Sequence, residues 1–277
     1  MRETAEGCRG AHREDHAQGG WHAFRHGTSG RGVSRERLDE ALVARGLYPT
    51  RSRARDAVKR GTVKVDGITA TKPAQPIAAE AVLSIADEAR TYVARSALKL
   101  KHALAHFELS PEGLNCLDIG ASTGGFTEVL LESGAAHVTA IDVGHDQFAA
   151  GLRAEPRITL WEGLNARDLT RDHLRTPLRF IVCDVSFISL KLALPAALDL
   201  AETGARLIAL IKPQFEAGRE ALGKDGIVKS ETLRQQICDD IASWLNGRGW
   251  GPIGLTPSPL KGGSGNTEYL VAAEKTA

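Results

Sequence analysis

Two hydrophobic periodicities alternate along the last two thirds of the chain. Short apolar runs, which predict buried strands, are separated by stretches with apolar residues every three to four positions, which predict amphipathic helices. Strands that alternate with helices in this way are typical of an α/β fold with a mostly parallel sheet and helices on both faces. The expected strands lie at 116–119, 138–142, 158–161, 180–184 and 206–212.

The same alternation continues to the end of the chain. A loop that contains glycine and lysine is expected over 213–229, between the fifth apolar run and the last helix. The remaining expected elements are helices over 190–200 and 231–245 and strands over 253–255 and 269–272.

Upstream of this pattern, the sequence predicts a small α+β unit over 34–88. Glycine follows each of its two helical stretches, which favours short helices. The expected elements are a helix capped by Ser34, a second helix over 53–60 capped by Thr50 or Ser52, and a strand over 63–68 that enters an Asp-Gly turn.

These patterns divide the chain into four parts. Residues 1–33 hold few apolar side chains and much Gly, Arg and His, so we expect a disordered N-terminal arm. The α+β unit over 34–88 follows, and a short linker over 89–94 leads to the α/β domain over 95–277.

Composition narrows the class of protein. The 277 residues carry a formal net charge of only +1, so total charge indicates no partner. No apolar run reaches the ~18 residues of a membrane span, and the N-terminus lacks the apolar centre of a signal peptide. The four cysteines are far apart and form no metal-binding or redox spacing. We therefore expect a cytoplasmic protein with reduced cysteines, no membrane partner and no metal.

Charge is concentrated in the small unit. Between residues 34 and 72, ten Lys and Arg oppose five Asp and Glu, which gives a net charge of +5. The excess lies on the second helix and its flanks, where it forms either a phosphate-binding face or an ordinary solvated helix face. The candidate RNA-binding residues are Arg51, Arg53, Arg55, Lys59, Arg60 and Lys64.

A glycine-rich turn follows the first apolar run of the α/β domain. Its spacing, D-x-G-x-x-x-G-G from Asp118 to Gly125, differs from the dinucleotide-binding G-x-G-x-x-G and resembles the S-adenosylmethionine (SAM) loop of class I methyltransferases. Asp142, about twenty residues after Gly120, is placed to accept hydrogen bonds from a ribose diol. If the loop binds SAM, as the resemblance implies, Asn165 at the exit of the third expected strand should lie beside the adenine. The candidate SAM-binding residues are Asp118, Gly120, Ala121, Ser122, Thr123, Gly124, Gly125, Phe126, Asp142, Asn165 and Asp184.

Three charged residues lie at the ends or edges of expected strands: Asp184, Lys212 and Glu268. Each alone fits a strand that simply meets solvent, but together, beside a SAM-type loop, they indicate a catalytic site at the ligand-binding edge of the sheet. Lys99 lies between apolar neighbours on an expected helix that begins near Ser96. Its own pattern predicts a surface lysine whose ammonium reaches solvent.

Longer motifs resemble known families. The segments R-L-D-E-A-L-V-A-R-G-L and S-R-A-R-D-A-V-K-R-G-T-V-K-V-D-G resemble the S-four RNA-binding domain. Lys99, Asp184, Lys212 and Glu268, within R-S-A-L-K-L, C-D-V-S-F, I-K-P-Q-F-E and N-T-E-Y-L, resemble the catalytic tetrad of the FtsJ-like ribose 2′-O-methyltransferases. The combination is similar to the TlyA family from about residue 35 to 273, although members often have R-G-G-L-K where this chain has R-S-A-L-K.

The resemblance implies a class I SAM-methyltransferase domain with a Rossmann-like fold after an S-four-like domain. It implies an enzyme that methylates the ribose 2′-hydroxyl of a cytidine in 16S and/or 23S rRNA, within 30S and/or 50S subunits. We expect the protein itself to be a monomer. Lys212 would act as base or alkoxide stabiliser, oriented by Asp184, while Glu268 and Lys99 would hold the ribose. Since family members are also named haemolysins, a membrane-lytic protein is one alternative. A second is a ribosome-binding factor whose methyltransferase fold is inactive.

Overall fold

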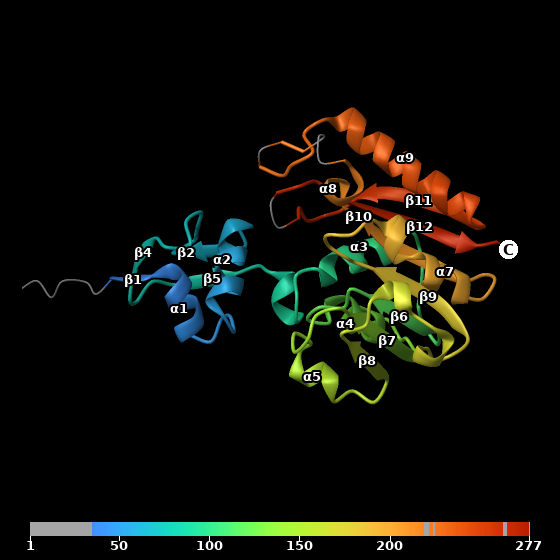
Figure 1. The fold of residues 1–277 in the computed structure, drawn as a ribbon. Coiled ribbons are helices and arrows are strands. Elements are labelled where there is room, and N and C mark those ends of the chain that lie inside the picture. The colour runs from blue at the N-terminus through green and yellow to red at the C-terminus, as the bar shows by residue number, and fades with distance from the viewer. Residues whose placement is uncertain (1–34, 219–221, 224, 263–264, 277) are drawn as a thin grey trace, which may run out of the picture.

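A computed structural model describes residues 35–218, 222–223, 225–262 and 265–276. The arm predicted over 1–33 and the cap predicted at Ser34 lie outside these residues. The chain folds as a small N-terminal unit followed by a larger α/β unit (Figure 1). None of the helices in the described ranges is long and apolar enough to cross a bilayer.

A seven-stranded sheet forms the centre of the larger unit, in the order β11-β12-β10-β9-β6-β7-β8. Strands β6 to β10 are parallel to one another, and β12 runs antiparallel between β10 and β11. The predicted α/β sheet is therefore confirmed. The strands are β6 (Asn115–Ile119), β7 (His137–Asp142), β8 (Ile158–Glu162), β9 (Leu178–Cys183), β10 (Arg206–Ile211), β11 (Trp250–Pro257) and β12 (Tyr269–Lys275).

Helices bury both faces of this sheet, which explains why its strands are continuous apolar runs. In β10, Leu207 packs in the core cluster on one face, and Ile208 packs in the cluster on the other. The first face is covered by α6 (Leu190–Ala193), α7 (Pro195–Leu200) and α9 (Glu231–Gly247), and the second by α3 (Ala97–His106) and α4 (Gly125–Glu132).

Two local predictions for the α/β unit need correction. The helix predicted over 190–200 is divided into α6 and α7, because Pro195 lacks an N–H and instead occupies the first turn of a new helix. The loop predicted over 213–229 begins with a helical turn, α8 (Pro213–Glu216). The short helix α5 (Ala150–Arg153) lies between β7 and β8.

The N-terminal unit packs two helices against short strands. The first helix begins later than predicted, at Leu38, because residues 35–37 instead form a strand that pairs with residues 76–78. The local sequence pattern does not reveal this pairing. Thr50 caps the second helix as predicted: its side chain accepts a hydrogen bond from Arg53 N at 3.3 Å. The elements are β1 (Arg35–Arg37), α1 (Leu38–Ala44), α2 (Arg51–Lys59), β2 (Val63–Val65), β3 (Ile68–Thr69), β4 (Pro76–Ala78) and β5 (Leu83–Ile85).

The segment between the units packs against α2. Arg53 donates hydrogen bonds to the carbonyls of Ala89 at 2.9 Å and Tyr92 at 2.6 Å, around the 3-10 turn η1 (Glu88–Thr91). Arg95, just beyond it, pairs with Asp56 of α2 at 2.8 Å. The conformation of the segment between the units is therefore held by side chains from both units.

Candidate active site

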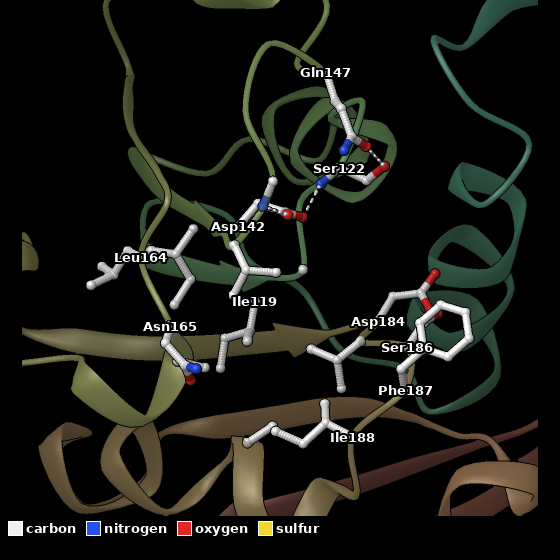
Figure 2. Close-up of a pocket in the computed structure, with 17 residues that line it drawn as sticks. Ile119, Ser122, Asp142, Gln147, Leu164, Asn165, Asp184, Ser186, Phe187 and Ile188 are labelled. Carbon is white, nitrogen blue, oxygen red and sulfur yellow. Dashed lines mark hydrogen bonds between the residues drawn. The ribbon is translucent and has the colours of Figure 1, made fainter.

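A cavity of about 550 Å³ opens at the carboxyl ends of β6, β7 and β9, where the strand order reverses (Figure 2). Open α/β sheets bind ligands at this position. Apolar side chains, among them Ile119, Ile141 and Leu164, line much of it. The predicted cofactor residues among its lining are Gly120, Ser122, Asp142, Asn165 and Asp184.

At the glycine-rich turn, the backbone that follows β6 lies close to the backbone that follows β9. Gly120 has a φ of +81°, and a Cβ there would lie 2.8 Å from the backbone oxygen of Asp184. Only glycine accommodates both the conformation and the contact. A smaller cavity of about 200 Å³ adjoins the turn, and its lining includes Gly120, Ala121, Ser122, Thr123, Phe126, Asp184, Ser186 and Lys212.

Asp142 is fixed by the backbone around it. Its Oδ2 accepts a hydrogen bond from Ser122 N at 2.8 Å, and its Oδ1 accepts one from Gly144 N at 2.7 Å (Figure 2). A carboxylate has about four acceptor sites, so Asp142 retains capacity for a ligand diol. Asn165 accepts from Arg167 N at 3.0 Å and also faces the larger cavity.

Asp118, Gly124 and Gly125 are buried within the loop and its supports, outside the lining of both cavities. Asp118 Oδ2 accepts a hydrogen bond from Thr127 Oγ1 at 2.6 Å, while its Oδ1 has no hydrogen-bond partner among the described residues. Burial raises the pKa of Asp118 to about 7, and the negative charge of Asp184 acts in the same direction. The buried position of Asp118 is therefore suited to an uncharged carboxyl group.

Replacing Asp118 by asparagine should change how stability depends on pH. A carboxyl group whose pKa rises on folding stabilises the folded state below its unfolded pKa, and this contribution is lost as pH rises through the folded value. Wild type should therefore lose about 2 kcal/mol relative to Asp118→Asn between pH 5.5 and pH 8. Urea unfolding of both proteins without ligand measures the difference, and parallel curves would contradict it.

Two ion pairs contain the four predicted catalytic residues. Lys212 Nζ lies 2.6 Å from Asp184 Oδ1 and donates a hydrogen bond to Ser186 Oγ at 2.8 Å. Lys99 Nζ donates to Glu268 Oε2 at 2.6 Å. Lys212 and Asp184 line the smaller cavity, whereas Lys99 and Glu268 are not among its lining residues.

The prediction from the local pattern that the Lys99 ammonium reaches solvent is wrong. Only 8% of the Lys99 side chain and 3% of the Glu268 side chain are exposed. The partner, Glu268, directly precedes β12 and is 169 residues away in the sequence, so no local pattern reveals it. Burial of both charges is tolerated because they pair and share a hydrogen bond.

Phe187 is a candidate functional residue that sequence reasoning missed. It has a φ of +66°, is 89% exposed and lines the larger cavity. Its ring lies 5.0 Å from that of Phe215, measured between centroids. An aromatic ring held in solvent beside a ligand cavity can stack on a nucleobase. The sequence around Phe187 does not indicate this role, because the backbone conformation that exposes the ring is visible only in the structure.

The predicted RNA-binding residues fall into two groups. Arg51 and Arg55 are exposed, and their guanidinium groups lie 3.2 Å and 3.9 Å from the buried carboxylate of Asp39. A hydrogen bond from Arg37 lowers the pKa of Asp39, so the group is ionised at neutral pH. Lys59 and Lys64 are also exposed.

Arg53 and Arg60 instead point inward. Arg53 binds the backbone carbonyls after β5, as described above. Arg60 donates to both carboxylate oxygens of Asp87 at 2.8 Å and to Asp56 at 2.8 Å. Their guanidinium groups therefore support the fold of the N-terminal unit and of the segment that follows it.

Metal-binding and cysteine-based sites have little support in the described part of the chain. It contains no cluster of three or more His, Cys, Asp or Glu placed to hold a metal ion. Cys116, Cys183 and Cys238 are buried free thiols, and burial raises the pKa of Cys116 to about 12. Cys8 lies outside the described residues.

Comparisons with known proteins agree with this architecture. The FtsJ-like methyltransferase model matches residues 92–275, and the S4 domain model matches residues 36–83. The 16S/23S rRNA (cytidine-2′-O)-methyltransferase TlyA of Mycobacterium tuberculosis is 43% identical over 86% of this chain and 89% of its own length. Hemolysin A of Brachyspira hyodysenteriae is 39% identical over 84% of this chain and 98% of its own length.

A solved structure from Streptococcus thermophilus, which carries the name hemolysin, superposes with a TM-score of 0.69 at 40% identity. The match covers 88% of this chain and 90% of that structure. Both domain models and the relatives cover nearly the whole described chain. The chain therefore belongs to the TlyA family, in which an S4 domain precedes an FtsJ-like methyltransferase domain.

Proposed function

We propose that the protein transfers the methyl group of SAM to the ribose 2′-hydroxyl of a cytidine in rRNA, within 30S and/or 50S subunits. The observation that carries this proposal is the Lys212–Asp184 pair on the wall of a cavity that adjoins the glycine-rich turn. The rRNA methyltransferase name of the Mycobacterium tuberculosis relative supports the choice of substrate.

The residues of the larger cavity fit SAM. Its apolar walls suit an adenine, Asp142 has free acceptor sites for the ribose hydroxyls, and Asn165 offers an amide for the edge of the base. The turn from Gly120 would meet the methionine part. When bound, SAM supplies a methyl group already activated by the positive sulfur.

The protein must then make a ribose hydroxyl nucleophilic. Lys212 would accept its proton, or stabilise the alkoxide as it forms. Asp184 and Ser186 hold the Lys212 ammonium from two directions and so fix its position. Glu268, itself held by Lys99, would bind the substrate ribose.

Labelled methyl transfer to separated 30S and 50S subunits tests the proposal. We expect incorporation into a cytidine of the rRNA of at least one subunit, with the modified nucleotide located by mapping. No incorporation into either subunit would contradict the proposal. Modification of the base, with the 2′-hydroxyl left free, would contradict the assigned reaction.

Asp142→Ala should weaken SAM binding about tenfold or more, because the variant loses both the diol acceptor and the support of the Ser122 backbone. Isothermal titration with SAM measures the effect. Asp172→Ala removes an exposed carboxylate of the same unit and should bind SAM normally. Equal affinity of the Asp142 variant and wild type would show that the diol lies elsewhere.

A further inference from the structure

A carboxylate outside the two ion pairs connects the loops that carry Asp184 and Lys212. Glu216 ends α8, four residues after Lys212, and is half-buried. Its Oε2 accepts a hydrogen bond from Ser189 Oγ at 2.5 Å, and its Oε1 accepts one from Leu190 N at 2.8 Å. Ser189 caps α6, so Glu216 joins the end of α8 to the start of α6.

The same two segments, 184–190 and 212–216, meet at two further points. Lys212 contacts Asp184 and Ser186, and the ring of Phe215 contacts that of Phe187. The 184–190 segment is therefore held to 212–216 along its whole length. Both segments follow the carboxyl ends of neighbouring parallel strands, β9 and β10.

The contact at Glu216 differs from the other two. The Lys212–Asp184 pair borders the cavity, where an incoming hydroxyl would compete for its hydrogen bonds. The aromatic contact involves a ring that is 89% exposed. Glu216 makes two hydrogen bonds with a charged acceptor, which are stronger than neutral ones, away from the lining of either cavity.

The 184–190 segment needs such external support. Phe187 adopts a φ of +66°, which is unfavourable for a residue with a Cβ and persists only where surrounding contacts enforce it. Helix α6 has only four residues, and the N–H groups of the first two, Leu190 and Lys191, need side-chain partners, because the backbone carbonyl of Ser189 binds only those of Leu192 and Ala193. Glu216 binds one of them directly and holds Ser189, which binds the N–H of Lys191 at 3.1 Å.

We propose that Glu216 is a positioning residue for methyl transfer. It holds Asp184 and Ser186 at the Lys212 ammonium and holds Phe187 at the edge of the larger cavity, without touching either reactant. The inference rests on the proposed function, because that function gives Lys212 its chemical role. Small displacements of aligned groups have large effects on rate, so loss of Glu216 should act mainly on turnover.

Four variants test the inference on the full-length protein. Glu216→Ala should lower kcat on ribosomal subunits about tenfold or more, with the dissociation constant of SAM within about threefold of wild type. Glu216→Gln should restore kcat to within about threefold, because its amide oxygen can accept from Leu190 and its amide group can donate to Ser189. Ser189→Ala should lower kcat less and add little to Glu216→Ala. Asp240→Ala, which removes an exposed carboxylate of α9, should match wild type.

Hydrogen–deuterium exchange supplies a readout that does not depend on activity. Glu216→Ala should increase exchange in peptides that cover 184–191 and leave β12 unchanged. Unchanged exchange at 184–191 would overturn the inference, as would wild-type kcat in Glu216→Ala. If Glu216→Ala and Glu216→Gln lost kcat to the same extent and also lost thermal stability to the same extent, the role of Glu216 would be purely structural. That result would also overturn the inference.

These outcomes separate the inference from the proposed function. If Lys212→Ala is inactive while Glu216→Ala is fully active, the inference fails and the function stands. If wild type methylates neither subunit, the proposed function fails. Hydrogen–deuterium exchange at 184–191 in Glu216→Ala then still decides whether Glu216 orders that segment.

Discussion

Lys212→Ala should lower the rate of methyl transfer to ribosomal subunits by about a thousandfold. Lys212 lines the smaller cavity, where its side chain could take a proton from a hydroxyl as the neutral amine or stabilise the resulting alkoxide as the ammonium. Asp142 and Asn165, which we assign to SAM, lie at the end of β7 and after β8, and they should keep their positions. Single-turnover methylation at saturating SAM, with SAM affinity measured in parallel, separates chemistry from binding.

Two further variants make this result specific. Lys212→Arg keeps a positive charge but gives up its proton far less readily. Partial activity would therefore favour alkoxide stabilisation, and activity as low as in Lys212→Ala would favour a base. Lys191→Ala removes an exposed lysine of α6 and should behave as wild type. Normal turnover of Lys212→Ala would exclude either role.

Removing Lys212 also leaves Asp184 without its cationic partner, and only 15% of the Asp184 side chain is exposed. A partly buried, unpaired charge destabilises the folded state. The double variant Lys212→Ala/Asp184→Asn should recover stability in urea without recovering activity. That combination would show that the loss of turnover does not come from unfolding.

The sheet could be predicted because its strands are buried on both faces. Each apolar run therefore stands out from its surroundings, and each helix shows one apolar side. The pairing of 35–37 with 76–78 could not be predicted, since it joins two three-residue segments about forty residues apart in the sequence. The break at Pro195 was visible in the sequence, because proline favours the first turn of a helix.

The candidate site was less accessible to sequence reasoning. The glycine spacing indicated a ligand turn, but the close approach of Gly120 to Asp184 is a tertiary contact. Burial of Lys99 depends on Glu268, and exposure of Phe187 depends on an unusual backbone conformation. Glu216 received no role, because its partners lie on another loop.

The two groups of arginines, in contrast, could have been distinguished by helical spacing. Arg51 and Arg55 are four residues apart on α2 and therefore share a face, whereas Arg53 lies on another side. The structure places the first pair in solvent around Asp39 and turns Arg53 inward. Of these three arginines, only the exposed pair is available to a phosphate backbone.

Arg51→Glu/Arg55→Glu should weaken binding to ribosomal subunits about a hundredfold at low salt, because it replaces two phosphate-binding cations by anions. The slope of log affinity against log salt concentration should become shallower by about two, one for each lost contact. Filter binding over a range of salt concentrations measures both quantities. Unchanged affinity and slope would exclude this face of α2 from RNA binding.

Arg60→Ala is the matched contrast, since it removes an arginine next to the same helix. Its loss leaves the Asp87 carboxylate, which is 1% exposed, without its bidentate partner. We therefore expect a loss of stability of about 3 kcal/mol in urea unfolding, with the salt slope of subunit binding unchanged. A shallower slope for Arg60→Ala would instead mean that its guanidinium leaves Asp87 to bind phosphate, and the inward group would then belong to the RNA-binding surface.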